Sequence, residues 1–365
     1  MNWNDKFPNL KSGPDLSTLP KELRHAILHE CLQRQHETLE GVGHFLRCAR
    51  ETLAYPKPPE IVAKWHAARL YHYRSPSNVA ARSPIIVVPS LINRYYILDL
   101  DEERSLVRYF ASLGHDVYLL DWNLPTQVET QFSIGDYINE ILCPATEFIF
   151  KRHAQKPAAI GYCMGGLLTL VMSILYPQNL SRMAVLATPW NFHSKDAIHT
   201  RLTAPRINVL REILQRSPLF PGEAILYFFY LSDPWRFQEK FRQFPKLKNK
   251  SDRQYFTAIE HWANDCVPLP RKVAVECFVE CQQENKPFEK RWRVNDVLID
   301  PTQIQIPCFI AAPQHDRIVP YGSSLALAQH IPHAKVHAPE SGHIGMITGA
   351  RRKSQLWQPL AAWLK

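Results

Sequence analysis

The segment AAIGYCMGGLLTLVMSILYP, residues 158–177, determines how the rest of this sequence is interpreted. It begins with a short apolar run typical of a buried strand, and from Met164 onward it has the composition of a buried helix. The five residues at the junction, GYCMG at 161–165, have the layout of a nucleophile elbow. In such an elbow a strand delivers a reactive side chain to a sharp turn, and a helix leaves from that turn. The segment therefore predicts a strand, a turn at Cys163 and a helix.

The same segment is long and apolar enough to raise the question of a transmembrane helix. Three glycines interrupt it, however, and it follows directly on Lys156-Pro157. A buried strand, turn and helix explain it better, so we expect no membrane-spanning segment. The N-terminal sequence MNWNDKFPNL lacks the apolar core of a signal peptide, and we therefore expect a cytoplasmic location with free thiols.

Apolar runs and helical patterns alternate along much of the chain. PIIVVPS at 84–90 is a continuous apolar run of the kind found in buried parallel strands. Further strands are predicted at 65–74, 115–122, 181–189, 307–313 and 334–341, and helices at 106–114, 133–152 and 321–331. This alternation predicts an α/β fold whose mostly parallel central sheet has helices on both faces.

Two later strands are followed by residues that complete a catalytic set with Cys163. Asp316 comes just after the strand at 307–313, and His343 just after the strand at 334–341. In α/β-hydrolase enzymes the nucleophile, the acid and the histidine occur in this chain order, each past the carboxyl end of a strand. We therefore predict a Cys163–His343–Asp316 triad on an α/β-hydrolase fold. His343 would take the proton of Cys163, and Asp316 would hold the imidazole in position.

An oxyanion hole is predicted from the same arrangement. Its usual donors are the backbone N–H just after the nucleophile and one N–H from the loop after an earlier strand. Here those positions are Met164 and, in the loop after 84–90, Ser90 or Leu91.

The chain is expected to divide into a core, an extension and an insertion. Residues 1–64 are predicted to form an N-terminal helical extension, and residues 65–189 and 301–365 the catalytic core. Residues 190–300 interrupt the alternation after the strand that follows the nucleophile helix, where hydrolase-fold enzymes carry a lid or cap. The insertion contains an aromatic-rich stretch at 225–237, which we interpret mainly as its own packed core.

The composition restricts the kinds of partner. The 365 residues carry a net charge of +9 with an isoelectric point near 9.1, so an anionic partner is expected. No zinc-finger spacing, RNA-binding signature or long basic tract is present, which argues against nucleic acid and favours substrate phosphates or an anionic particle surface. Among the eight cysteines, Cys277 and Cys281 are four apart but lack companion ligands, so no metal site is predicted.

Several segments together resemble one family, the polyhydroxyalkanoate synthases, and in particular the short synthases that act with a second subunit. The resemblance runs from about Trp65 to the C-terminus. It is carried by RLYHY, IIVVPSLINRYYILDL, GHDVYLLDWNLPT, SIGDYI, GYCMGG, HWANDCVPLP, HDRIVP and SGHIGMI. It implies that Asn93, Trp262 and Trp190 contact the substrate.

Three positions depart from the family pattern. Ser90 stands where proline is usual, Asn123 where glycine is usual, and Arg317 where histidine is frequent. None of them belongs to the predicted triad, so we expect the family chemistry with an altered range of substrates or partners.

The resemblance implies an acyltransferase that polymerises (R)-3-hydroxyacyl-CoA thioesters into polyhydroxyalkanoate and releases CoA through a thioester on Cys163. No cofactor is implied, because CoA enters with the substrate. The implied partners are the 3-hydroxyacyl-CoA substrate, a polyester granule surface in the cytoplasm and a second synthase subunit, in a homodimer or a hetero-oligomer.

Other interpretations of the sequence stay open. A hydrolase of the same fold, such as an intracellular polyester depolymerase or a thioesterase, would use the same triad. A non-enzymatic granule-binding protein would not need a reactive thiol, and in that case Cys163 would be a buried, inert cysteine beside glycines.

Overall fold

The computed structural model describes residues 19–49, 55–197, 212, 214, 217–232, 234–331 and 333–365. These residues fall into two compact units. One unit consists of residues 19–49 and 234–257, and the other of residues 55–232 and 258–365 with the gaps just given.

The larger unit is built on a sheet of eight strands in the order β1-β2-β4-β3-β5-β6-β11-β12. The strands are β1 Ile61–Trp65, β2 Ala68–Tyr73, β3 Arg82–Val88, β4 His115–Asp121, β5 Ala158–Tyr162, β6 Arg182–Leu186, β11 Cys308–Ala311 and β12 Lys335–His337. From β4 to β12 every neighbouring pair is parallel, whereas β1 and β2 join the edge in antiparallel fashion. The predicted α/β-hydrolase fold with a mostly parallel sheet is confirmed.

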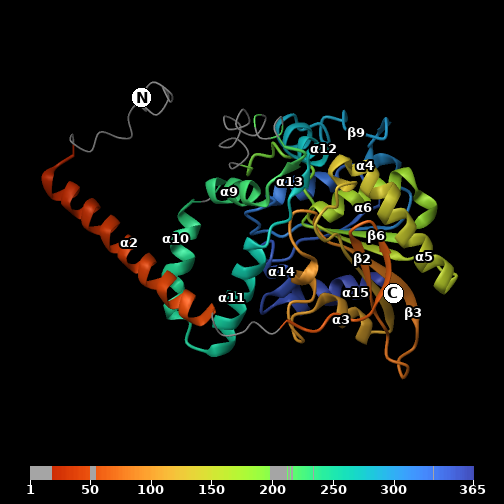
Figure 1. Ribbon diagram of the computed structural model, residues 1–365, viewed down its shortest axis with the longest axis horizontal. Helices are drawn as coiled ribbons and strands as arrows, with labels where there is room; N and C mark the ends of the chain where they lie inside the picture. The colour runs from red at the N-terminus through yellow and green to blue at the C-terminus, as the bar shows by residue number, and fades with distance from the viewer. Residues whose placement is uncertain are drawn as a thin grey trace. The chain divides into compact units, whose positions relative to one another are not determined.

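Helices cover both faces of this sheet. Figure 1 shows α4, α5 and α6 on one face and α3 and α15 on the other. Their bounds are α3 Leu106–Ser112, α4 Ile134–Tyr137, α5 Cys143–His153, α6 Met164–Leu175 and α15 Gln358–Leu364. A π-helical turn, η5 Ile138–Leu142, joins α4 to α5 without a break, so the helix predicted at 133–152 is continuous.

Further helices, turns and two small ribbons complete the described structure. The helices are α9 Gly222–Ser232, α11 Lys250–Asn264, α12 Arg271–Ala274, α13 Tyr321–Ala328 and α14 Gly345–Thr348, with π-helices η9 Val275–Gln283 and η11 Lys353–Trp357. Short 3₁₀ turns lie at η3 Tyr95–Leu98, η4 Glu129–Gln131, η6 Pro177–Asn179, η8 Phe244–Lys246 and η10 Pro301–Gln303. Two small ribbons pair β7 Leu219–Phe220 with β8 Leu269–Pro270, and β9 Arg293–Val294 with β10 Val297–Leu298.

The segment 65–74, predicted as one strand, contains the last residue of β1, a turn and then β2, which together form a hairpin. β1 ends at Trp65, and β2 begins at Ala68. Between them His66 takes a positive φ of 53°, and the N–H of Ala67 donates to a carboxylate oxygen of Glu129 at 3.2 Å. No glycine, proline or asparagine marks this turn, so the residue pattern gave no sign of it.

The centre of the sheet is also the centre of the hydrophobic core. All five residues of β5 are buried, and so are ten consecutive residues of α6, from Met164 to Ser173. Burial on every side explains why this stretch is apolar all round. At 12 residues α6 is about 18 Å long, short of the ~30 Å apolar layer of a bilayer. Among the described residues, none of the helices combines the length and apolarity needed to cross a membrane.

The smaller unit packs the N-terminal helix against part of the insertion. Its elements are α2 Lys21–Ala49, α10 Pro234–Gln243, η8 and the first half of α11. Phe45 meets the rings of Phe241, Phe244 and Phe256 at centroid distances of 5.3, 5.6 and 6.0 Å. Gly41 lies against the backbone of Phe241, where a side chain would collide.

This division differs from the boundaries drawn on the sequence. The extension predicted for residues 1–64 includes β1, which belongs to the sheet, and the described part of its helix pairs with residues 234–257 of the insertion. The rest of the described insertion belongs to the larger unit. Contacts between segments nearly 200 residues apart cannot be recognised from local composition, which explains the difference.

Candidate active site

Cys163 sits at a sharp turn between β5 and α6. Its backbone has φ 56° and ψ −122°, a combination that costs energy for any residue with a Cβ. Two hydrogen bonds hold the turn: the Cys163 N–H donates to the carbonyl of Leu186 at 2.8 Å, and the Gly166 N–H donates to the carbonyl of Cys163 at 2.9 Å. As a residue, Cys163 is partly exposed.

Three glycines leave the room that this turn requires. A Cβ on Gly165 would collide with the Val88 carbonyl, and one on Gly166 would collide with the Thr188 hydroxyl. At Gly161 it would lie 2.5 Å from the hydroxyl oxygen of Thr169. The glycines therefore allow α6 to start in direct contact with the ends of its neighbouring strands.

The structure brings His343 and Asp316 together. The His343 Nδ1 donates to Asp316 Oδ2 at 2.7 Å, and both side chains are almost fully buried. The other carboxylate oxygen of Asp316 accepts the backbone N–H groups of Ile318 and Val319, each at 2.8 Å. With all of these bonds made, the carboxylate is fixed, and it holds the imidazole with Nε2 free for a second partner.

Cys163 is the predicted second partner. Burial by itself lowers the pKa of His343, but the charge of Asp316, the proximity of Cys163 and hydrogen bonds to both raise it to about 10. The imidazolium form is therefore favoured between the carboxylate and the sulfur. A histidine in this state stabilises a thiolate beside it, which is the nucleophilic form of cysteine.

The loop that carries one predicted oxyanion-hole position passes close to the start of the helix that carries the other. Met164 is the first residue of α6, so its N–H has no acceptor within the helix. The loop after β3 runs alongside, because the backbone of Pro89 closely approaches Gly165. The Pro89 carbonyl also accepts the indole N–H of Trp122 at 3.0 Å, which fixes the loop just before the buried Leu91.

The three residues predicted to contact substrate occupy different environments. Asn93 and Trp262 come close together in the larger unit, but both engage protein partners: the Asn93 amide lies 3.5 Å from the sulfur of Cys266, and the Trp262 indole donates to the Arg94 carbonyl at 2.8 Å. Trp190 is only 1% exposed and packs against Trp292. Their contact with substrate stays a prediction, and Trp190 in particular lies within the core.

Sequence reasoning missed Cys277, which belongs to this region. Its sulfur lies 3.8 Å from the sulfur of Met164, and its pKa is raised well above the ordinary value by burial and then by Glu276 and Cys163. A neutral thiol therefore contacts Met164, the residue just after Cys163 in the elbow. The only sequence signal was its position in a helical segment, which suggested a packing residue.

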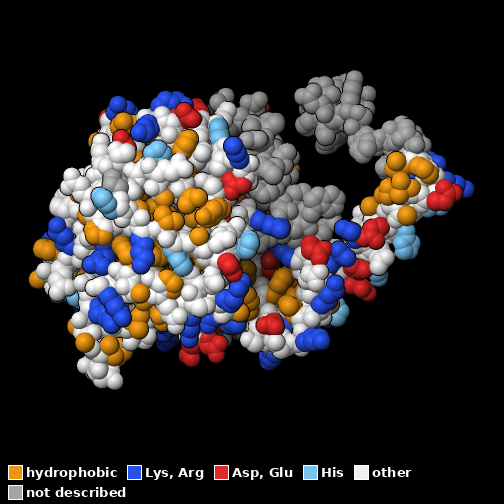
Figure 2. All heavy atoms as spheres, turned by 180° about the vertical axis from the view of Figure 1, so that it is seen from behind, with side chains coloured by type: hydrophobic (Ala, Val, Ile, Leu, Met, Phe, Trp, Pro, Cys, Tyr) orange, Lys and Arg blue, Asp and Glu red, His pale blue; other side chains and the backbone are white. Residues whose placement is uncertain are grey.

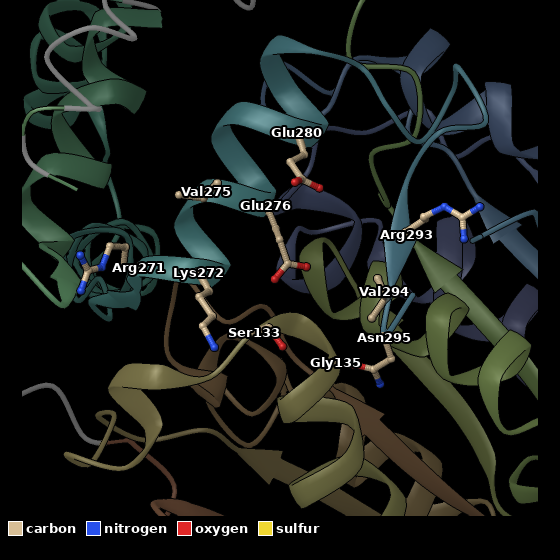
Figure 3. Close-up of a pocket in the computed structure, with 10 residues that line it drawn as sticks. All are labelled: Ser133, Gly135, Arg271, Lys272, Val275, Glu276, Glu280, Arg293, Val294 and Asn295. Carbon is tan, nitrogen blue, oxygen red and sulfur yellow. The ribbon is translucent and has the colours of Figure 1, made fainter. Parts of the chain in front are cut away.

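A separate cavity of about 430 Å³ lies on the other side of η9. Figure 3 shows the side chain of Glu276 directed from η9 into this cavity, near Lys272 and Ser133. The Glu276 carboxylate accepts the N–H of Ile134 at 3.1 Å, and burial raises its pKa to about 7. No residue of the predicted triad lines this cavity.

On the face seen in Figure 2, Lys and Arg side chains are interspersed with apolar and acidic ones and form no continuous basic stripe. All eight cysteines are free thiols. Among the described residues, no group of three or more His, Cys, Asp or Glu side chains is placed to hold a metal ion.

The fold and the strand–cysteine–helix turn define the class of protein. Residues 83–350 match the family described as alpha/beta hydrolase fold, so the chain is an α/β hydrolase by fold. A solved structure from Sulfolobus solfataricus, described as a candidate lipase, superposes with a TM-score of 0.55 over 86% of this chain and 99% of its own, at 13% identity. At that identity the likeness shows the fold alone.

Within that class, the chain belongs to the polyhydroxyalkanoate synthase (PhaC) family, as the motifs suggested. Residues 51–110 match the N-terminal region of poly-beta-hydroxybutyrate polymerase. Relatives named poly(3-hydroxyalkanoate) polymerase subunit PhaC include one from Haloferax mediterranei, 26% identical over 84% of this chain. These relatives are named as polymerases.

The relatives differ in length. The chain spans 63% of the Haloferax mediterranei protein, but it covers 92% of a relative from Synechocystis and 96% of one from Allochromatium vinosum. Each of the last two is 25% identical, over 92% and 93% of this chain respectively. All three names contain the word subunit, which describes a component of a larger enzyme.

Proposed function

We propose that this chain is an acyltransferase that polymerises (R)-3-hydroxyacyl-CoA thioesters into polyhydroxyalkanoate and releases CoA. The observation that carries the proposal is the buried His343–Asp316 pair directed at a cysteine in the elbow, where serine is usual for hydrolysis. The choice of polymer rests on the names of the relatives, which are poly(3-hydroxyalkanoate) polymerase subunits.

The first step loads the enzyme. The Cys163 thiolate attacks the thioester carbonyl, and the oxyanion that forms is held by the N–H groups of Met164 and Leu91. The bond between the acyl carbon and the CoA sulfur then breaks. The CoA thiolate takes the proton of the His343 imidazolium, which leaves an acyl-Cys163 thioester, a neutral His343 and free CoA.

The second step lengthens the chain. The hydroxyl of another hydroxyacyl unit attacks the carbonyl of acyl-Cys163, while His343 removes the hydroxyl proton. The acyl carbon–sulfur bond breaks, an oxoester forms, and the Cys163 thiolate and His343 imidazolium are restored. Asp316 keeps Nδ1 engaged throughout, so that Nε2 carries the moving proton.

Sulfur suits this sequence of steps. Moving an acyl group from the CoA sulfur to the Cys163 sulfur is nearly isoenergetic, so the bound acyl group retains its transfer potential. An acyl-serine ester would have lost that driving force before the second hydroxyl arrived. Water has to be excluded while the thioester waits, and the burial of His343 and Asp316 favours this.

An assay with (R)-3-hydroxybutyryl-CoA tests the proposal. We expect wild-type protein to release CoA and to make the solution turbid with polymer, and Cys163→Ala to do neither. Release of CoA with free 3-hydroxybutyrate and no polymer would instead identify a thioesterase or depolymerase of the same fold. A Cys163→Ala variant that retains full function in cells would point to a non-enzymatic granule-binding protein.

The partners are part of the proposal. We infer that the chain acts with a second synthase subunit at the surface of cytoplasmic polyester granules, since the relatives are named as subunits. The same assay run with and without candidate partner subunits tests this: polymer formation should rise when the partner is present. An activity unchanged by every candidate, with the protein a homodimer in solution, would contradict the second subunit.

A further inference from the structure

The loop after β3 is attached to the segment that follows α11. The Val267 N–H donates to the Ile92 carbonyl at 2.7 Å, and Asn93 forms an isolated antiparallel bridge with Cys266. The Trp262 indole donates to the Arg94 carbonyl at 2.8 Å. Three contacts along three successive residues of the loop, residues 92–94, thus hold its backbone against residues 262–267.

Asp265 completes this attachment through side chains. Its Oδ1 lies 3.5 Å from the Nε of Arg94, and its Oδ2 accepts the hydroxyl of Tyr96 at 3.1 Å. The hydrogen bond and the charge of Asp265 add to burial in raising the pKa of Tyr96 far above its ordinary value, so the tyrosine remains a donor. One carboxylate therefore holds two residues of the loop at once.

Arg94 also reaches the end of β4. Its Nη1 donates to the side-chain oxygen of Asn123 at 3.2 Å. Asn123 takes a positive φ of 58°, which explains how it can stand where the family usually has glycine, because asparagine tolerates this conformation better than most residues. In this chain the substitution gives Arg94 an additional acceptor.

The attached loop leads directly to the proposed oxyanion hole. Leu91 is the residue before Ile92, and Pro89, two residues earlier, lies against Gly165 at the start of α6. The loop is therefore held on one side by the elbow and on the other by residues 262–267. Leu91, whose N–H would face the oxyanion, lies between these two attachments.

We propose that Asp265 is a positioning residue: through Arg94 and Tyr96 it holds the loop whose Leu91 N–H stabilises the oxyanion during acyl transfer to and from Cys163. This inference rests on the proposed function. It also gives Trp262 and Asn93 a role in the same attachment, in addition to the substrate contact predicted from the sequence.

The test compares two reactions of Cys163 that differ in their need for an oxyanion hole. Acylation by p-nitrophenyl butyrate or 3-hydroxybutyryl-CoA passes through an oxyanion, whereas alkylation by iodoacetamide does not. Removal of one oxyanion-hole donor costs ~10²–10³ in rate, and we expect Asp265→Asn, which displaces a donor, to slow acylation by about 10- to 100-fold. Alkylation should stay within about twofold of wild type, and the loss should fall on kcat rather than KM.

Two further variants keep the result interpretable. Tyr96→Phe removes a single hydroxyl, so it should fold even if Asp265→Asn does not, and it should slow acylation in the same direction. Glu60→Gln breaks an exposed ion pair with Arg74, 3.1 Å long, and should change neither reaction. A cooperative thermal unfolding transition for each variant will establish that the variant is folded.

Other outcomes would overturn the inference or the function separately. Acylation at the wild-type rate in both Asp265→Asn and Tyr96→Phe would exclude the positioning role, and so would equal slowing of acylation and alkylation. A wild-type protein that is acylated by p-nitrophenyl butyrate but releases no CoA from 3-hydroxybutyryl-CoA would reject the proposed substrate. In that case the comparison with the p-nitrophenyl ester still tests Asp265.

Discussion

His343 and Asp316 decide what Cys163 can do. Two backbone N–H groups and one imidazole N–H engage both oxygens of the Asp316 carboxylate, and this group raises the pKa of His343 by both its charge and its hydrogen bond. A cysteine at the same turn without this pair would be an ordinary partly exposed thiol. We therefore infer that the pairing makes Cys163 a nucleophile rather than a packing residue.

Substitution of Asp316 tests this at the level of one residue. We expect Asp316→Asn to lower the rate of acyl transfer by about 10³- to 10⁴-fold, because the imidazole loses its orientation and its charge partner. The pKa of His343, which is about 10 in the wild type, should fall. NMR titration of selectively labelled histidine measures that shift, and an unchanged His343 pKa would contradict the assigned role.

The same substitution should alter the dependence of stability on pH. The folded pKa of His343 is raised above the ordinary 6.5, so the native state binds a proton that the unfolded state releases between pH 6.5 and about 10. This stabilisation is complete below pH 6.5 and is lost as the pH rises through 10. The difference in unfolding free energy between wild type and Asp316→Asn should therefore shrink over that range.

At the level of elements, the π-helix η9 contributes residues both to the surroundings of the elbow and to the cavity of Figure 3. It presents Cys277 to Met164 on one side and Glu276 to the cavity on the other. π-helical turns are rare in proteins overall, but those that occur are often found at functional sites. Here two adjacent residues of the π-helix lie in two different environments.

Glu276 gives a test of this element. Burial raises its folded pKa from the ordinary 4.5 to about 7, so the native state binds more protons than the unfolded state between these values, and stability falls as the pH rises from 4.5 to 7. Glu276→Gln removes the charge and keeps an acceptor for Ile134. We expect the variant to be more stable than wild type at pH 8, by ~1–3 kcal/mol, and to match it near pH 5.

Urea unfolding at both pH values measures the difference. Glu284→Gln is the matched control, because Glu284 directly follows η9, pairs with Lys286 at 3.3 Å and does not line the cavity. Equal stability of Glu276→Gln and wild type at pH 8 would show that the carboxyl group is solvated in solution.

At the scale of the whole molecule, the net charge of +9 bears on the proposed substrate. The CoA part of a 3-hydroxyacyl-CoA carries several phosphate charges, and salt screens attraction between separated charges, with a Debye length of ~10 Å at 0.1 M. We expect KM for 3-hydroxybutyryl-CoA to rise several-fold between 50 and 500 mM NaCl. KM for the uncharged p-nitrophenyl butyrate should stay constant, and a parallel rise for both would indicate a general effect of salt on the protein.

The whole molecule also shows which elements local sequence patterns can predict and which they cannot. The strands predicted around 84–90, 115–122 and 158–162 form the buried centre of the sheet, where residues are apolar on both faces and the pattern is clear. The hairpin at 61–73 and the pairing of α2 with α10 were not predicted. Each depends on contacts between segments or on a turn without glycine or proline.

The sequence by itself determined the fold class, the turn at Cys163 and the chain order of the cysteine, the aspartate and the histidine. Strand and helix periodicity and the glycine spacing are local properties, so they can be recognised in one chain. Only the tertiary structure decided that Asp316 Oδ2 meets His343 Nδ1 at 2.7 Å, that Cys277 contacts Met164, and that residues 262–267 hold the loop after β3. These contacts join residues from 27 to about 175 positions apart. Packing of the whole sheet and its insertion sets them, and no local pattern encodes that packing.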